Sequence, residues 1–132
     1  MLAGLNHITI AVSDLEKSFY FYVSILGMKP EVKWDAGAYL SVGKLWICLS
    51  LDKASPARDY SHIAFDVSTS EFDSYCAQLL SAGVETWKEN ASEGDSLYIL
   101  DPDGHKLEIH VGSLESRLEA LQSVSYKGLR WY

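Results

Sequence analysis

The sequence predicts an α+β fold built from two copies of a β-α-β-β-β module, and an internal repeat is the main reason. The strand-like runs NHITIAV (residues 6–12) and SHIAFDV (61–67) each place one histidine at the same position of an apolar segment. A helical segment that opens with Ser-x-x-Glu and closes on a glycine follows each run. His7 and His62 lie 55 positions apart. Two modules with matching strand, helix and turn signals therefore make up most of the chain.

The first module is expected over about residues 1–52. After the first strand comes the helical segment SDLEKSFYFYVSILG (13–27), in which Ser13 caps the helix and Glu16 reaches back to it. Three strand-like runs separated by turn signals at Asp35-Ala36-Gly37 and Gly43-Lys44 follow: KPEVKW (29–34), GAYLSV (37–42) and KLWICLSL (44–51).

The second module is expected over about residues 60–112, after a polar linker, DKASPARD (52–59). Its helix is predicted from Ser68 to Gly83, with Glu71 completing the cap. The strand-like runs VETWKEN, SLYIL and KLEIHV follow, and the turn signal Asp-Pro-Asp-Gly separates the last two. A short helix and an aromatic tail complete the single domain over 113–132.

The composition is that of one globular domain. The chain has 132 residues, of which 48% are hydrophobic and 22% charged, so it can bury a core. A net charge of −7 argues against nucleic acid or an anionic membrane as the main partner. No signal-peptide pattern and no membrane-length apolar run occur, so we expect a cytoplasmic protein. Cys48 and Cys76 lack metal-knuckle spacing and are expected to be reduced.

Side-chain alternation along the strands decides which residues line the concave face of the predicted sheet. We expect the two modules to form one curved mixed sheet with the helices outside. The aliphatic positions of the first strand face the helices, which turns His7 and Thr9 into the concavity. By the same alternation His62 faces the concavity, and so do Glu108 and His110 of the last strand.

Two imidazoles and a carboxylate that converge in a cup are typical of a divalent-metal site with open positions. A single strand histidine is usually structural, but two at equivalent repeat positions with a glutamate of matching parity favour ligation by His7, His62 and Glu108. Alignment of LEIH in the last strand with LWIC in the fourth places Trp46 at the position of Glu108. An indole cannot bind a metal, so three protein ligands are expected. His110 has no repeat counterpart and receives no role.

The motifs of the chain resemble those of the vicinal-oxygen-chelate superfamily, and within it the fosfomycin-resistance glutathione transferases. The resemblance extends over nearly the whole chain, and the motifs that carry it are GLNHITIAV, WDAGAYL, LWICLS, YSHIAF, WKENASEGDSLYILDPDGHKLEIHVG and SRL. The resemblance implies a Mn(II)-dependent enzyme that adds the glutathione thiolate to the epoxide of fosfomycin and so inactivates the antibiotic. It also implies a homodimer with exchanged modules. Each metal site would then combine His7 of one subunit with His62 and Glu108 of the other subunit.

The same resemblance implies roles around the metal. Thr9 would lie beside the epoxide oxygen, Tyr39 near the attacking sulfur, and Trp46 along the pocket wall. The residues implied to contact the phosphonate are Lys88, Ser92, Tyr98 and Arg117. The residues implied to bind K⁺ are Asn90, Ser92, Glu93, Gly94 and Ser96. Ala91 departs from the family, where a basic residue is common at this position. The resemblance therefore does not specify which residues contact the carboxylates of glutathione.

Electrostatics supports a local anion site in this acidic chain. Fosfomycin is a small dianion at neutral pH, so Lys88, Arg117 and the metal must supply a positive well. The thiol of glutathione has an unperturbed pKa near ~8.5, and hydrogen bonding from Tyr39 together with nearby cations would favour the thiolate.

Other functions remain open at this level. A dioxygenase of the same superfamily would hold Fe(II) with the same triad, although the Lys88/Arg117 pair and the K⁺-like loop favour the transferase. An epoxide hydrolase needs a carboxylate base near the metal, which Trp46 and its neighbours do not offer. A bacillithiol-dependent transferase would differ only in the thiol. A non-catalytic drug-binding module would need no metal triad.

Overall fold

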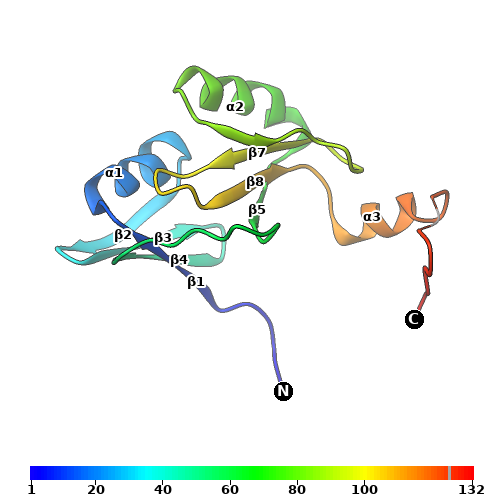
Figure 1. Cartoon of the computed structure of the whole chain (residues 1–132), viewed down its shortest axis with the longest axis horizontal. Helices are drawn as coiled ribbons and strands as arrows, with labels where there is room; N and C mark the ends of the chain where they lie inside the picture. Colours follow the sequence, from blue (N-terminus) through cyan, green and yellow to red (C-terminus); the bar gives the residue numbers. More distant parts are fainter. Residues whose placement is uncertain (125) are drawn as a thin grey trace.

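The chain folds into two four-stranded mixed sheets, with the helices of the two modules packed on one side (Figure 1). The computed structural model describes residues 1–124 and 126–132. The strand orders are β1-β4-β3-β2 and β5-β8-β7-β6, with β1 parallel to β4 and β5 parallel to β8. The strands are β1 (His7–Val12), β2 (Lys29–Trp34), β3 (Gly37–Val42), β4 (Leu45–Leu51), β5 (Ile63–Asp66), β6 (Thr86–Lys88), β7 (Ser96–Leu100) and β8 (Lys106–His110). The predicted α+β class and the two β-α-β-β-β modules are confirmed.

The first helical segment differs in detail from the prediction. It consists of an α-helix, α1 (Leu15–Tyr20), that continues into a π-helix, η1 (Phe21–Ile25). The expected cap at Ser13 is wrong: Asp14 is the N-cap, and its carboxylate accepts from the backbone N–H of Lys17 at 3.1 Å. The Ser13 hydroxyl instead donates to Asp103 of the second module. Both serine and aspartate make good caps, so the sequence pattern could not separate these neighbours.

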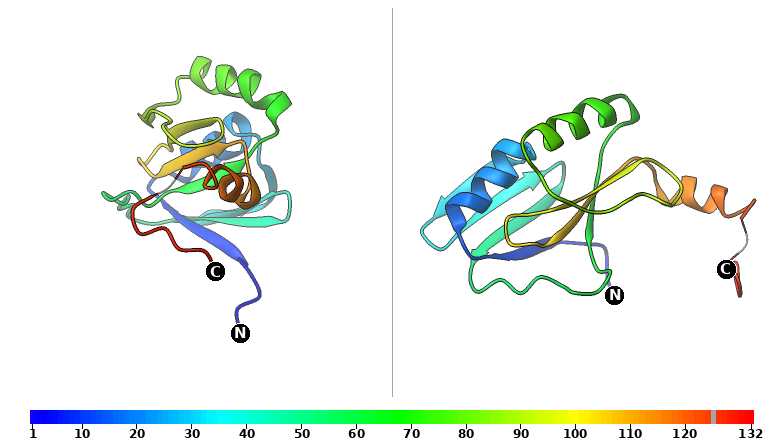
Figure 2. Two further views of the ribbon diagram at one scale, coloured as in Figure 1. Left: turned by 90° about the vertical axis from the view of Figure 1, so that its right-hand side faces the viewer. Right: turned by 45° about the horizontal axis from the view of Figure 1, so that its top comes forward.

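The later helices follow the prediction more closely. The N-cap of α2 (Thr69–Ser81) is Ser68, but the Ser68 hydroxyl donates to the Glu71 carboxylate at 2.8 Å rather than accepting from the backbone. The glycines expected after the two module helices adopt positive φ angles, 84° at Gly27 and 81° at Gly83. The third helix, α3 (Leu114–Ala120), has a capping box at Ser113 and projects beyond the ends of both sheets (Figures 1 and 2).

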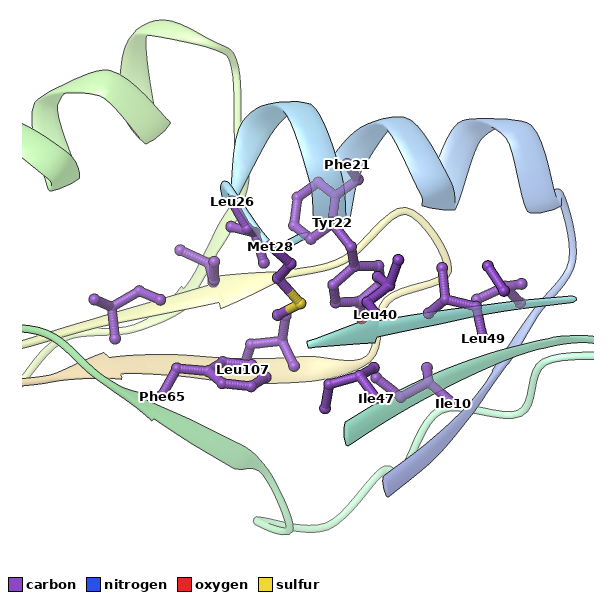
Figure 3. Packing of buried hydrophobic residues seen from close by; sticks show 14 of the residues in the cluster. Ile10, Phe21, Tyr22, Leu26, Met28, Leu40, Ile47, Leu49, Phe65 and Leu107 are labelled. Atoms are coloured by element: carbon purple, nitrogen blue, oxygen red, sulfur yellow. The ribbon is translucent and has the colours of Figure 1, made fainter. Parts of the chain in front are cut away.

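One hydrophobic core joins both modules beneath the helices (Figure 3). It combines the helix-facing residues of the two sheets with side chains from α1, η1 and α2, and includes Ile10, Val12, Phe21, Tyr22, Met28, Leu40, Ile47, Leu49, Phe65, Leu79, Ile99, Leu107 and Ile109. The strand residues in this set are the ones that alternation assigns to the helix side. The opposite faces of both sheets are therefore left for polar and aromatic side chains.

The modules also meet along a polar seam. The buried Tyr22 hydroxyl of module one donates to Asp101 of module two at 2.7 Å, and Tyr75 of α2 donates to the Leu26 carbonyl at 2.6 Å. Burial, and the nearby Asp101 carboxylate, raise the pKa of Tyr22. Over the described residues no ladder joins the two sheets, so the single curved sheet expected within one chain is replaced by two sheets held by core and seam.

Helix length and hydropathy also bear on membrane insertion. Among the described residues, none of the helices has both the length and the apolar character needed to cross a membrane.

Candidate metal centre

Two of the three predicted metal ligands meet on the second sheet. His62 immediately precedes β5, and Glu108 lies in the middle of β8, which pairs with β5. Nε2 of His62 lies 2.9 Å from Oε2 of Glu108. Ligand atoms about 2.1 Å from one ion at right angles would be about 3 Å apart, so this spacing suits a shared metal. Glu108 is only 6% exposed, and a buried carboxylate needs partners.

The hydrogen bonding of His62 prepares its other nitrogen for a metal. Nδ1 lies 2.7 Å from the Tyr60 carbonyl oxygen, which only accepts, so Nδ1 carries the proton and donates it. In the neutral ring Nε2 then directs a lone pair at the Glu108 carboxylate. Two such acceptors at 2.9 Å repel unless a proton or a cation lies between them. This donor set fits a divalent ion, with the Tyr60 carbonyl fixing the imidazole from behind.

Two side chains hold the second oxygen of the Glu108 carboxylate, Oε1. The Ser96 hydroxyl donates to Oε1 at 2.6 Å, and Nδ1 of His110 lies 3.3 Å from the same oxygen. Burial by itself raises the pKa of Glu108, but the hydrogen bond from Ser96 and the electrostatic effect of the two neighbouring histidines outweigh it and hold the pKa below its usual range. The carboxylate is therefore ionised at neutral pH, as a metal ligand must be.

His7 lies on the other sheet of the same chain. It starts β1, is exposed, and stacks on Trp46 of β4 with ring centres 4.3 Å apart. Within the described residues, the groups of His, Cys, Asp and Glu whose ligand atoms lie within 4.8 Å of one another do not include His7 with His62 and Glu108. The single chain thus assembles two of the three predicted ligands and leaves His7 apart.

Further aromatic rings extend from Trp46, the neighbour of His7, across the first sheet. Tyr39 of β3 contacts Trp46 edge-to-face at 5.1 Å and Trp34 at 4.9 Å. Thr9 lies two residues after His7 on β1, so its side chain is on the same exposed face of the sheet. This face of module one therefore carries His7, Thr9, Tyr39 and Trp46 together, all open to solvent in the chain.

Lys88 lies beside the His62–Glu108 pair in an aromatic surround. Its ammonium is 4.5 Å from the ring centre of Tyr60 and 4.8 Å from that of Tyr98, and it donates to the Tyr60 hydroxyl. That hydrogen bond raises the pKa of Lys88, so the ammonium stays charged. Tyr98 is the register partner of Glu108 and is 2% exposed. The Lys88 ammonium is thus fixed next to the candidate ligands.

The predicted K⁺ loop is organised by Asn90 and Arg117. The Asn90 amide donates to the Gly94 carbonyl at 2.7 Å and accepts from the Ser92 N–H at 3.1 Å. Arg117 of α3 donates through Nε to the Glu93 carboxylate and through Nη2 to the Glu93 carbonyl, both at 3.0 Å. A guanidinium carries five N–H groups, so Arg117 keeps donors for an anion beyond these two. The loop and the predicted anion contact therefore form one unit.

Strand register corrects the predicted equivalence between Trp46 and Glu108. Ile8 pairs with Ile47 in module one, and its repeat counterpart Ile63 pairs with Leu107 in module two. The residue equivalent to Glu108 is therefore Cys48, which pairs with Thr9. A slip of two residues keeps every side chain on its face, so the hydrophobic pattern could not detect it. The fourth corner of the pseudo-symmetric site carries a thiol.

A separate carboxylate group at the seam is already saturated by the protein. Ligand atoms of Asp101, Asp103 and His105 lie within 4.8 Å of one another. Asp101 accepts from Tyr22 and from the backbone N–H groups of Asp103 and His105, while His105 donates through Nε2 to the Ala11 carbonyl at 2.7 Å. These contacts explain why the three side chains lie together: they hold the turn at residues 101–105 against module one.

Sequence reasoning missed several site residues. Tyr60 and Trp87 enclose His62, with ring centres 5.0 and 5.7 Å from it, and Trp34 extends the aromatic wall of module one. A signal for Tyr60 existed, since it lies two positions before His62 and so shares its strand parity. Trp34 and Trp87 each open one of the motifs that carry the family resemblance, but no role was predicted for either.

Comparison with known proteins places this geometry in a family. The model of the Glyoxalase/Bleomycin resistance protein/Dioxygenase superfamily matches residues 4–109. The chain belongs to this superfamily. Glutathione transferase FosA of Serratia marcescens is 50% identical over 98% of the chain and 95% of that protein, and metallothiol transferase FosB of Lysinibacillus sphaericus is 40% identical over 88% and 87%. The predicted resemblance to the fosfomycin-resistance members of the superfamily is confirmed.

Solved structures of superfamily members agree with the fold. The fosfomycin resistance protein FosX of Listeria monocytogenes, in complex with Mn(II) and sulfate, superposes with a TM-score of 0.81 at 34% identity, over 91% of the chain and 98% of FosX. A monoclinic form of the same FosX gives a TM-score of 0.82 over 91% and 99%. The vicinal-oxygen-chelate fold implied by the resemblance is thus the fold of this chain.

Proposed function

We propose that the chain is a metal-dependent transferase that adds the thiol of glutathione to the epoxide of fosfomycin. In the overall reaction the sulfur bonds to an epoxide carbon, the carbon–oxygen bond breaks, and the oxygen becomes a hydroxyl with the proton that the thiol supplies. The observation that carries the proposal is the His62–Glu108 pair, with Nε2 and Oε2 2.9 Å apart and each side chain fixed from behind. The FosA relative, 50% identical, is a glutathione transferase.

The metal is proposed to be Mn(II), held by His7, His62 and Glu108. When bound, a divalent ion supplies Lewis-acid stabilisation of the oxygen released as the epoxide opens. The FosX relative binds Mn(II), and imidazole and carboxylate ligands suit this ion. Because His62 and Glu108 lie on one sheet and His7 on the other, the chain supplies two halves of a site.

A second copy of the chain is proposed to complete the site. In a homodimer with exchanged modules, the face around His7 of one protomer would cover the face around His62 and Glu108 of the other. The open aromatic face supports this arrangement, since Trp46 is 38% and Tyr39 37% exposed in the chain and a partner would bury both. Thr9 and Tyr39 would then reach the epoxide oxygen and the attacking sulfur, and Trp46 would line the pocket.

The phosphonate is proposed to bind near Lys88. The ammonium is pre-positioned by Tyr60 and Tyr98, and Arg117 retains unused donors at the neighbouring loop. Ser92 and Tyr98 would add hydroxyl contacts. Such a cluster concentrates positive charge against the overall charge of −7, as a small dianion requires.

The loop over residues 90–96 is proposed to bind K⁺ through Asn90, Ser92, Glu93, Gly94 and Ser96. Activity should then rise several-fold when K⁺ replaces Na⁺ at constant ionic strength, because a filled loop holds Arg117 and Ser96 in place. Initial rates in paired KCl and NaCl buffers measure this. Equal rates in both salts would remove the loop assignment without touching the metal site.

A hydrolase, a bacillithiol transferase and a dioxygenase are distinguished by the products. Protein, Mn(II) and fosfomycin are incubated with glutathione, with bacillithiol or without thiol, and the products are analysed by mass spectrometry. We expect the glutathione thioether as the main product. A diol without thiol would indicate hydrolysis, a faster bacillithiol adduct the other transferase, and protection of fosfomycin at one equivalent without turnover a binding module. Oxygen uptake with a catechol and Fe(II) would indicate a dioxygenase.

A further inference from the structure

His110 is a half-buried histidine that the proposed reaction does not use. It lies on β8, two residues after Glu108 and on the same face of the sheet. Its Nδ1 is 2.7 Å from the Ser96 hydroxyl and 3.3 Å from Oε1 of Glu108. His110 therefore touches both the carboxylate and the hydroxyl that fixes it.

The direction of these hydrogen bonds follows from the number of protons. The Ser96 hydroxyl has one proton, and at 2.6 Å it donates it to Oε1 of Glu108, since an ionised carboxylate only accepts. The Ser96 oxygen must then accept from His110, which fixes the proton of His110 on Nδ1. The result is a directed chain from His110 through Ser96 to Glu108 that leaves Oε2 facing His62.

Two glycines make room for the His110 ring. A Cβ on Gly94 would lie 3.0 Å from the ring carbon Cε1 and 2.4 Å from the Val111 carbonyl oxygen, and a Cβ on Gly112 would lie 2.9 Å from Nε2. Both glycines have positive φ, +81° and +143°. The ring thus fills the space between the loop that holds Glu93 and the segment that leads into α3.

We propose that His110 is a positioning residue that aims Glu108 at the metal through Ser96 and ties the loop over 90–96 to that carboxylate. The inference rests on the proposed function in so far as Glu108 is a metal ligand. The same hydroxyl belongs to the proposed K⁺ loop, so occupancy of the loop and orientation of the ligand are coupled through Ser96. Outer hydrogen bonds of this kind typically change metal affinity about 10–100-fold when removed.

Two substitutions separate the hydrogen bond from the packing of the ring. His110→Phe keeps a ring between Gly94 and Gly112 but has no donor, whereas His110→Asn loses the ring but places an amide N–H near the position of Nδ1. We expect His110→Phe to weaken Mn(II) binding about 10–100-fold and His110→Asn to stay within about threefold of the wild type. Binding is measured by electron paramagnetic resonance of unbound Mn(II), and folding by circular dichroism.

A double substitution and the response of Mn(II) affinity to K⁺ complete the test. Ser96→Ala should match His110→Phe in Mn(II) affinity, and the double variant should be no worse than either single one, because both break the same chain. We also expect the K⁺ effect on Mn(II) affinity to vanish in His110→Phe. Unchanged Mn(II) affinity in a folded His110→Phe protein, or equal losses in the Phe and Asn variants, would overturn the proposal. A wild type that binds no Mn(II) would instead refute the proposed function.

Discussion

The two modules have the same topology, but they present opposite kinds of surface on the faces turned away from the helices. On module two the polar groups lie close together and are sheltered from solvent: Glu108 is 6% exposed and contacts the half-buried His62 and Ser96. On module one the corresponding face is aromatic and open, with Trp46 38% exposed and stacked on His7. Register sharpens the contrast, because Cys48 occupies the position of Glu108.

This difference shows how the residues of one metal site can be distributed between two copies of a duplicated module. The module that keeps the carboxylate must compensate its desolvation internally, and it does so with Ser96 and His110 on one oxygen, while the other oxygen faces His62. The other module contributes one imidazole and apolar walls, which need no internal partner but are left unshielded from water. Each half is incomplete, which favours a second copy as the natural complement.

Removal of the charge on module two should give the largest effect. Glu108→Gln replaces the anionic ligand by a neutral amide, and we expect Mn(II)-dependent adduct formation to fall at least about 100-fold, since metal stabilisation contributes several kcal/mol. The fold should survive, because the helix-side neighbours Leu107 and Ile109 are unchanged. Product analysis and circular dichroism check both points. Full turnover in this variant would exclude Glu108 from the ligands.

Restoring the symmetry of the two faces should give the next largest effect. Cys48→Glu places a second carboxylate at the position equivalent to Glu108, and we expect Mn(II) to bind about tenfold more tightly and turnover to fall about tenfold as an open ligand position is filled. Cys48→Gln, of equal size and no charge, is the control and should do neither. The same metal affinity in both variants would argue that Cys48 is remote from the ion.

Mixing two inactive variants tests whether the faces meet between chains. His7→Ala damages only module one and Glu108→Gln only module two, so each homodimer lacks an intact site. After co-refolding at equal amounts, half of the dimers are mixed and each has one intact site of two, which predicts about one quarter of wild-type activity. Activity no higher than that of the separate variants would contradict the exchanged-module dimer.

The contacts at the seam should give the smallest effect. Tyr75→Phe removes the hydroxyl bonded to Leu26, and we expect a loss of about 1 kcal/mol in the free energy of unfolding at pH 7. Burial raises the pKa of Tyr75 to about 12. Between pH 10 and 12 the unfolded chain therefore binds fewer protons than the folded one at this residue, and stability falls as pH rises.

Urea unfolding of both proteins across this pH range measures the effect. The difference in stability between wild type and Tyr75→Phe should shrink as the pH rises from 10 to 12, because other tyrosines titrate in both proteins alike. A constant difference would show that the Tyr75 hydroxyl is not protected in the fold.

Much of the fold could be predicted from the sequence, because strands, turns and helix ends leave local patterns in it. The strands at 29–34, 37–42 and 96–100 have the predicted bounds, and the glycines after the two module helices take the expected conformation. Alternation placed Glu108 and His62 on one side of the sheet. The prediction failed at the Ser13 cap, at the equivalence of Trp46 and at the single sheet within one chain. Neighbouring caps and two-residue register shifts fit the same local pattern, and no local pattern specifies whether the two sheets join.

Strand parity and helix caps depend on near neighbours along the chain, so the residue types that face the site could be predicted from local patterns. Which of these residues meet depends on contacts between distant segments: His62 pairs with Glu108, Ser96 and His110 hold the second oxygen, and His7 lies on another sheet. Register and long-range packing fix these contacts, and a shift of two residues along a strand changes every partner while leaving the hydrophobic pattern intact.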